Sequence, residues 1–125
     1  MAQTEEHGDL KMYIFVLRSL ESGKAAVQVG HAVERLTYQA VCDMYEQLPG
    51  PPSATTLAYL AWRNHPTKIC YGADSDQLVA LASENGACCV VDDDWAPGTL
   101  TVVAFAPRKQ APSAPETTQW KLLYS

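Results

Sequence analysis

A short apolar run followed at once by a long amphipathic repeat constrains the fold more than any other feature of this sequence. Residues 12–17, MYIFVL, are β-branched, aromatic or aliphatic and end at a polar turn, which predicts a strand buried on both faces. Ser22 is the predicted N-cap of the helix that follows, and the PGPP segment at 49–52 is the predicted stop. The apolar positions of that helix are Val29, Val33, Leu36, Ala40, Met44 and Leu48. A buried strand that leads directly into a long helix is typical of an α/β unit.

The rest of the chain continues this alternation. A short helical turn is expected at 57–62, a strand at 68–71, a helix at 74–82, a third strand at 88–91 and a fourth at 99–106. The last two strands are close enough in the chain to form a hairpin. The order predicts an α/β fold with a mostly parallel sheet and helices on both faces.

Length and composition indicate one globular domain. The chain has 125 residues, of which 47% are hydrophobic and 18% charged, so it can bury one sizeable core. Residues 1–9 are expected to be a disordered leader and residues 10–125 a single domain. No apolar run approaches the ~20 residues that cross a bilayer, and the acidic start MAQTEEHGDL does not resemble a signal peptide. We expect a soluble, cytoplasmic protein that does not bind membranes.

Cysteine spacing and net charge exclude some classes of function. The four cysteines, Cys42, Cys70, Cys88 and Cys89, include no CxxC pair, and we expect reduced, mostly buried thiols and no metal site. The formal charge of −5 argues against general binding to nucleic acid, and we expect no DNA partner. A local basic patch is still compatible with the sequence, because several cations lie in its first part, among them Lys11, Arg18, Lys24, Arg35 and Lys68.

One polar stripe on the long helix is a candidate site. Lys24, Gln28, His31 and Arg35 follow one another at steps of four, three and four, which places them within a sector of roughly 60° on the side away from the apolar positions. Any amphipathic helix has such a solvated face. This stripe, however, starts with Gly23 and Lys24 at a helix N-terminus, at the carboxyl end of a buried strand, where free amides and a cation favour an anion.

A run of three aspartates follows the third predicted strand. Asp92, Asp93 and Asp94 could hold a divalent cation, orient a water molecule or simply end the strand. The strand order places this turn and the start of the long helix at the same edge of the sheet. Two common motifs are absent, because Lys24 lacks the GxxxxGK[ST] spacing of a P-loop and no serine lies in a GxSxG elbow.

Several segments of the chain resemble one enzyme family. The segment GKAAVQVGHA (23–32) is similar to the GKxAAQxxHA signature of the archaeal and eukaryotic, or second, class of peptidyl-tRNA hydrolase. The resemblance continues in order through KMYIFVLR, KICYGADSDQL, APGTLTVVAFAP and TTQWKLL, and it covers most of residues 11–123.

The resemblance implies a fold, an activity and a set of site residues. It implies a three-layer α/β/α fold with a four-stranded mixed sheet whose last strand is antiparallel. It also implies hydrolysis of the ester between a peptide and tRNA, a homodimer and no cofactor. Lys24 matches the family's catalytic cation, while Gln28 and His31 match the residues that support it. Gly23 and Lys68 are further expected substrate contacts.

The turn after the third strand departs from the family pattern. DDDWAPGT is shorter than the family's segment, so one of Asp92, Asp93 and Asp94 is expected to replace the catalytic acid, and Asp92 and Asp93 are the predicted catalytic residues. The family's threonine is absent from this turn, and Thr99 does not stand in for it. Val27 replaces the usual alanine, and the whole pattern is similar to a divergent eukaryotic branch.

Three functions are therefore compatible with the sequence. The leading hypothesis is a peptidyl-tRNA hydrolase in which Lys24 stabilises the oxyanion and an aspartate positions water. The alternative is a catalytically inactive module that binds tRNA or protein, with Lys24, Arg35 and Lys68 on phosphates. A small-molecule or nucleotide enzyme at the same sheet edge is a third hypothesis. The resemblance assigns no role to Arg35, which in the hydrolase hypothesis belongs to the solvated face.

Overall fold

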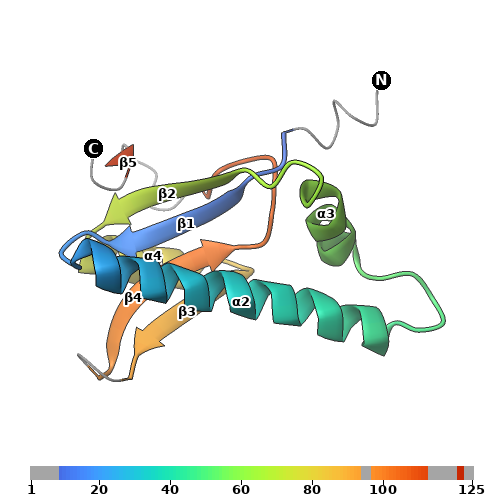
Figure 1. Ribbon diagram of the computed structural model, residues 1–125, viewed down its shortest axis with the longest axis horizontal. Helices are drawn as coiled ribbons and strands as arrows, with labels where there is room; N and C mark the ends of the chain where they lie inside the picture. The colour runs from blue at the N-terminus through green and yellow to red at the C-terminus, as the bar shows by residue number, and fades with distance from the viewer. Residues whose placement is uncertain (1–8, 94–96, 113–120, 123–125) are drawn as a thin grey trace.

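The computed structural model describes residues 9–93, 97–112 and 121–122, in which helices lie on both faces of one sheet (Figure 1). Residues 1–8 of the expected leader lie outside this part. The elements in chain order are β1 (Met12–Leu17), α2 (Ser22–Glu46), α3 (Ala54–Trp62), β2 (Lys68–Ala73), α4 (Ser75–Ala82), β3 (Ala87–Asp92), β4 (Thr99–Phe105) and β5 (Lys121–Leu122). All the expected elements are present, and the expected short turn at 57–62 is a full helix, α3.

The sheet has the strand order β3-β4-β1-β2-β5. Its four main strands form the expected mixed sheet, in which β4 is antiparallel to β1, and the two-residue β5 extends it by pairing with β2. The expectation of a mostly parallel sheet is wrong for neighbouring strands, because β4 lies between β3 and β1 and leaves β1 and β2 as the one parallel pair in the described part. Since β1 and β3 are both antiparallel to β4, they point the same way. Their carboxyl ends therefore meet at one edge of the sheet.

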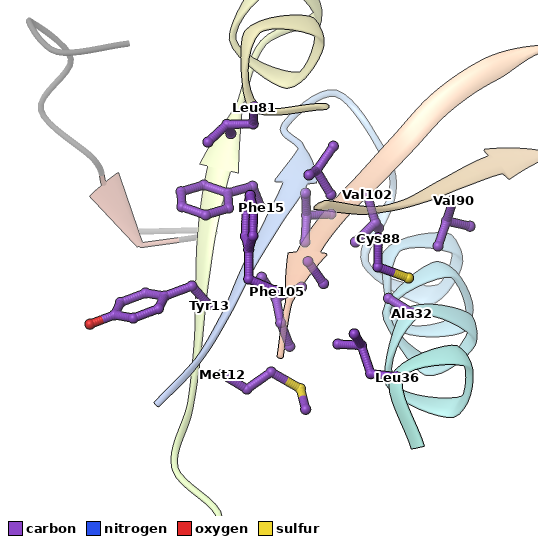
Figure 2. Close-up of a cluster of buried hydrophobic side chains, with 14 of the residues drawn as sticks. Met12, Tyr13, Phe15, Ala32, Leu36, Leu81, Cys88, Val90, Val102 and Phe105 are labelled. Carbon is purple, nitrogen blue, oxygen red and sulfur yellow. The ribbon is translucent and has the colours of Figure 1, made fainter. Parts of the chain in front are cut away.

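Strand alternation divides the core between the two faces of the sheet (Figure 2). Met12, Val90 and Val102 face α2, where they meet Ala32 and Leu36. On the other face, the ring of Phe15 lies edge-on to Phe105, with 6.2 Å between the ring centres. It stacks on Tyr71, with 5.5 Å between the ring centres, and lies next to Leu81 of α4. Both surfaces of the sheet are thus covered, which confirms the three-layer α/β/α architecture.

Helix α2 differs from its sequence-based description at both ends. Its N-cap is Glu21, which makes no side-chain capping bond, and Ser22 is the first helical residue instead of the cap. Ala25, Ala32, Leu36 and Ala40 are its buried positions. Met44 and Leu48, which continue the apolar spacing of the helix in the sequence, are exposed, because the last turns of α2 run past the edge of the sheet (Figure 1).

The structure also bears on the expected reduced thiols and on the expected lack of a membrane-spanning segment. All four cysteines are free thiols; Cys88 is buried and the other three are half-buried. Burial raises the pKa of the Cys70, Cys88 and Cys89 thiols, so these groups are protonated at neutral pH. No helix in the described part of the chain is long and apolar enough to span a membrane.

Candidate functional site

The candidate site lies at the sheet edge where β1 and β3 end and α2 begins. After β1 the chain turns through Leu20, whose N–H donates to the Leu17 carbonyl at 3.1 Å. Leu20 is buried, and its burial holds the start of α2 against the end of the strand. The helix therefore begins beside the carboxyl end of the sheet, where α/β proteins commonly bind their ligands.

A cleft of about 410 Å³ opens at this edge. Three successive turns of α2 bring Lys24, Gln28 and His31 to its wall, and β3 brings Asp92. The cleft is completed by Leu20, Glu21, Gly23 and Val27. The structure thus brings together five of the residues predicted from the sequence, which come from segments more than sixty positions apart: Gly23, Lys24, Gln28, His31 and Asp92.

The geometry distinguishes the three aspartates. Asp92 is the last residue of β3, is only 4% exposed and lines both the main cleft and an adjoining pocket of about 110 Å³. Its carbonyl accepts the Gly98 N–H at 3.0 Å, and Gly98 adopts a φ of 85°, a left-handed conformation that favours glycine, to close the turn. Asp93 is exposed and lines the smaller pocket but not the main cleft. Asp94 lies outside the described residues. Asp92 is therefore the candidate acid of the cleft.

A buried threonine behind the cleft was missed from the sequence. Strict alternation along β4 would place Thr101 with Val103 and Phe105 on the α4 side of the sheet. The pairing shifts, however, because Val90 faces Val102 and Val91 faces Leu100, which leaves Thr101 as the extra residue of a β-bulge. The hydroxyl of Thr101, fully buried, instead reaches Gln28 of α2 at 2.8 Å. A polar residue inside the apolar run TLTVVAF is the signal that could have identified it.

The hydroxyl of Thr101 fixes the Gln28 side chain. Its Oγ1 lies 2.8 Å from Gln28 Oε1 and 3.1 Å from the Val90 carbonyl, to which it can also donate. With Oε1 accepting from Thr101, the Gln28 amide nitrogen makes no hydrogen bond within the described part of the chain and keeps both of its N–H donors for a ligand. A half-buried donor held in one orientation suits a developing negative charge.

The first turn of α2 brings positive charge to the part of the cleft that the start of this helix lines. Its free N–H groups carry the positive end of the helix dipole, no acidic residue occupies the first turn, and Lys24 adds a half-buried ammonium. A Cβ placed on Gly23 would meet no atom within 4 Å, so open space adjoins these amides. Asp92 adds a carboxylate to the same cleft from the end of β3. The cleft therefore presents an ammonium, helix N–H groups and a carboxylate to a polar ligand.

Two cations from the sequence analysis do not join the cleft wall. Arg35, assigned to the solvated face, instead donates from Nη1 to the Cys89 carbonyl at 2.7 Å and so occupies the free edge of strand β3. Lys68 begins β2 and pairs in register with Met12, at the opposite end of β1 from the cleft. Its ammonium lies 5.1 Å from the ring centre of Trp62, as in a cation–π contact.

The chemistry that the cleft can perform follows from its donor set. Within the described ranges, no three His, Cys, Asp or Glu side chains cluster as a metal-binding group would require. The cleft instead offers an ammonium, an oriented amide, an imidazole and a buried carboxylate, which can bind an anionic ligand, polarise a carbonyl and position water.

A comparison with known families identifies the family of the chain. The model of the family described as peptidyl-tRNA hydrolase PTH2 matches residues 10–123. No curated protein matches the sequence. The match extends over nearly the whole chain, so the chain belongs to the PTH2 family.

Proposed function

We propose that this PTH2-family chain hydrolyses the ester bond of peptidyl-tRNA and releases peptide and free tRNA. The observation that carries the proposal is the convergence of Lys24, Gln28 and the buried Asp92 on one cleft. Family membership supplies the substrate class, and the cleft supplies the groups that ester hydrolysis needs. We place the reaction in the cytoplasm, as part of translation, and expect it to need no cofactor.

Each group has a distinct role in the proposed reaction. Asp92 accepts a hydrogen bond from the attacking water and directs its oxygen to the ester carbonyl. As the carbonyl oxygen becomes an oxyanion, the Lys24 ammonium and the Gln28 amide stabilise its charge, and His31 supports their arrangement. Asp92 takes a proton from the attacking water as the new bond to the carbonyl carbon forms. The tetrahedral intermediate then breaks its bond to the ribose oxygen, which takes up that proton from Asp92 and leaves as the hydroxyl of the tRNA, while the peptide leaves with its new carboxyl group. Asp93, outside the main cleft, has no direct part in this proposal.

The tRNA end of the substrate is expected at the start of α2. The free N–H groups of the first turn and the open space at Gly23 suit a phosphate of the tRNA terminus. Lys68 stays a proposed substrate contact, but from the opposite end of β1 it could reach only a distant part of the tRNA backbone.

One hydrolysis assay tests the proposal. We expect Lys24→Ala to lower the rate on a model peptidyl-tRNA about a hundredfold or more, because an oxyanion-stabilising group contributes several kcal/mol to the barrier. The matched control is Lys109→Ala, which removes the same charge from an exposed position away from the cleft. Melting temperatures should show that both variants are folded.

The outcomes separate the proposed hydrolase from its alternative. A Lys24→Ala protein as fast as the unmodified protein would exclude the proposed role of Lys24. Binding of tRNA without any turnover by the unmodified protein would replace the hydrolase with the inactive binding module. In that case the affinity should fall steeply with added salt, since phosphate contacts release counterions.

A further inference from the structure

The end of the sheet opposite the candidate cleft contains a larger hollow. A groove of about 650 Å³ lies between α3 and the turn that joins α4 to β3, where β4 ends. Leu36 of α2, Ala58 of α3 and Phe105 of β4 contribute apolar walls. Small-molecule sites commonly have ~300–1,000 Å³ and mostly apolar walls with a few polar groups. The groove therefore has the size and the lining of a ligand site, and no described residue of its wall lines the cleft.

Two groups of opposite charge line the groove. Glu84 lies in the turn after α4, Arg108 lies shortly after β4, and both residues are half-buried. The main chain of Arg108 is fixed, because its N–H donates to the Lys11 carbonyl at 3.0 Å and its carbonyl accepts the Lys11 N–H at 3.0 Å. Its guanidinium carbon lies 5.3 Å from the ring centre of Phe105, as in a cation–π contact. These contacts hold a cation in a defined place on the wall of the groove.

One carboxylate oxygen of Glu84 lacks a hydrogen-bond donor. Its Oε2 is buried and accepts no hydrogen bond within the described part of the chain, so Arg108 does not bond to this atom. The backbone of the turn is already paired, since the Glu84 N–H donates to the Leu81 carbonyl at 3.0 Å and the Ala87 N–H donates to the Glu84 carbonyl at 3.2 Å. A buried polar atom without a partner costs free energy, and most such atoms in folded proteins have one. The groove that Glu84 lines is where the missing donor can lie.

We propose that the groove binds a zwitterionic amino acid with an apolar side chain. The ammonium group of the ligand donates to the Glu84 carboxylate, and its carboxylate accepts hydrogen bonds from the Arg108 guanidinium. The side chain of the ligand packs against the apolar walls. A purely anionic ligand would leave Glu84 unpaired, and a purely cationic ligand would leave Arg108 unpaired. A zwitterion provides a partner for both charges.

The groove and the candidate cleft lie far apart. Arg108 pairs with Lys11, immediately before β1, whereas the cleft lies where β1 ends. The six residues of β1 span ~20 Å at ~3.3 Å per residue. An amino acid in the groove consequently makes no contact with Lys24 or Asp92. The proposal stands whether or not the cleft hydrolyses peptidyl-tRNA.

Calorimetric titration with L-leucine tests the binding of a zwitterion. We expect saturable binding to the unmodified protein with a Kd below ~1 mM, because the ligand is small but pairs two charges. N-acetyl-L-leucine lacks the ammonium group and L-leucine amide lacks the carboxylate, so each should bind at least about tenfold more weakly. A titration of L-leucine without saturable binding would overturn the proposal, and equal binding of N-acetyl-L-leucine would do the same.

Substitutions test whether the ligand lies in the groove. Glu84→Gln keeps the shape of the side chain but removes its charge, and it should raise the Kd for L-leucine at least about tenfold. Glu46→Gln, at the exposed end of α2, is the matched control and should bind as the unmodified protein does. Arg108→Gln should also weaken binding about tenfold, while Lys109→Gln, at the exposed next position, should not. Melting temperatures should show that these variants are folded.

The outcomes also distinguish the groove from the cleft. Lys24→Ala should bind L-leucine normally, because Lys24 lies in the cleft and not in the groove. An unchanged Kd in a folded Glu84→Gln or Arg108→Gln protein would contradict the proposed pairing of charges. Binding that Lys24→Ala abolishes would place the amino acid in the cleft and overturn the proposal.

Discussion

The two halves of α2 present different surfaces from one continuous helix. In the first half, Lys24, Gln28 and His31 line the cleft, and residues of β3 and β4 lie behind them. In the second half, tyrosines and aliphatic residues point outward where the helix has passed the edge of the sheet (Figure 1). The same helical repeat therefore produces a polar cleft at one end and a bare apolar stripe at the other.

The two halves of α2 differ because only the first half lies next to the buried polar residues of β3 and β4. Near its start, α2 packs against strands whose buried polar groups, Asp92 and Thr101, reach towards the helix. Burying polar groups costs free energy, and proteins concentrate such groups at functional sites. Their presence at this end of α2 therefore indicates a binding or catalytic region. Further along its length, α2 also packs on α3, where the hydroxyls of Thr37 and Tyr59 lie 2.6 Å apart. The outer side of this part of the helix, which includes Tyr38 and Tyr45, is exposed.

The largest effect should come from the carboxylate of the first half. We expect Asp92→Asn to lower the hydrolysis rate about a hundredfold, because an amide of the same shape cannot accept the hydrogen bond of the attacking water as strongly. Asp93→Asn is the matched control, since it removes a charge from the exposed neighbour, and its rate should stay within about threefold of the unmodified protein. Steady-state kinetics on both variants would decide. A larger loss in Asp93→Asn than in Asp92→Asn would reverse the assignment of the two aspartates.

A smaller effect is expected where the sheet supports the cleft from behind. Thr101→Val keeps the buried volume but removes the hydroxyl that holds Gln28, so we expect about a tenfold lower kcat. Stability should change by about 1 kcal/mol, the net contribution of one such hydrogen bond. Thr99→Val, two residues earlier in β4 and without a described side-chain bond to α2, is the control. If kcat were unchanged in Thr101→Val while only KM rose, the threonine would not position a catalytic donor.

The sequence is sufficient to predict the elements but not every direction in which side chains point. Helix α2, the β3–β4 hairpin and the meeting of Gly23, Lys24 and Asp92 at one edge follow from periodicity and strand order. Thr101 does not follow, because one bulged residue moves its side chain to the other face of the sheet, and nothing local in the sequence fixes where the register shifts.

Long-range packing explains two other differences. Periodicity identifies the apolar positions of α2 but gives no information on where the sheet ends, so it cannot show that Met44 and Leu48 are exposed. Arg35 lies within the polar stripe, yet its guanidinium bonds to the Cys89 carbonyl of β3, a strand edge that only the folded topology defines. The individual elements are thus local properties of the sequence, while their partners depend on strands far along the chain.

The smallest effect is expected where the second half of α2 is tied to the following loop. Hydrogen bonds from the side chain of Thr56 and the backbone of Ser53 lower the pKa of Asp43. A carboxyl group with a pKa lowered by folding stabilises the protein above its unfolded pKa of about 3.9, and this contribution disappears as the pH falls through the lower folded value. Asp43→Asn should therefore lower the melting temperature slightly at neutral pH, and the difference from the unmodified protein should shrink on acidification. Glu46→Gln, which removes the same charge from the same exposed end of the helix, is the control and should show no such pH-dependent difference. The difference in melting temperature between Asp43→Asn and the unmodified protein could instead stay the same in acid. In that case packing, and not the ionised carboxylate, would hold the loop against the second half of α2.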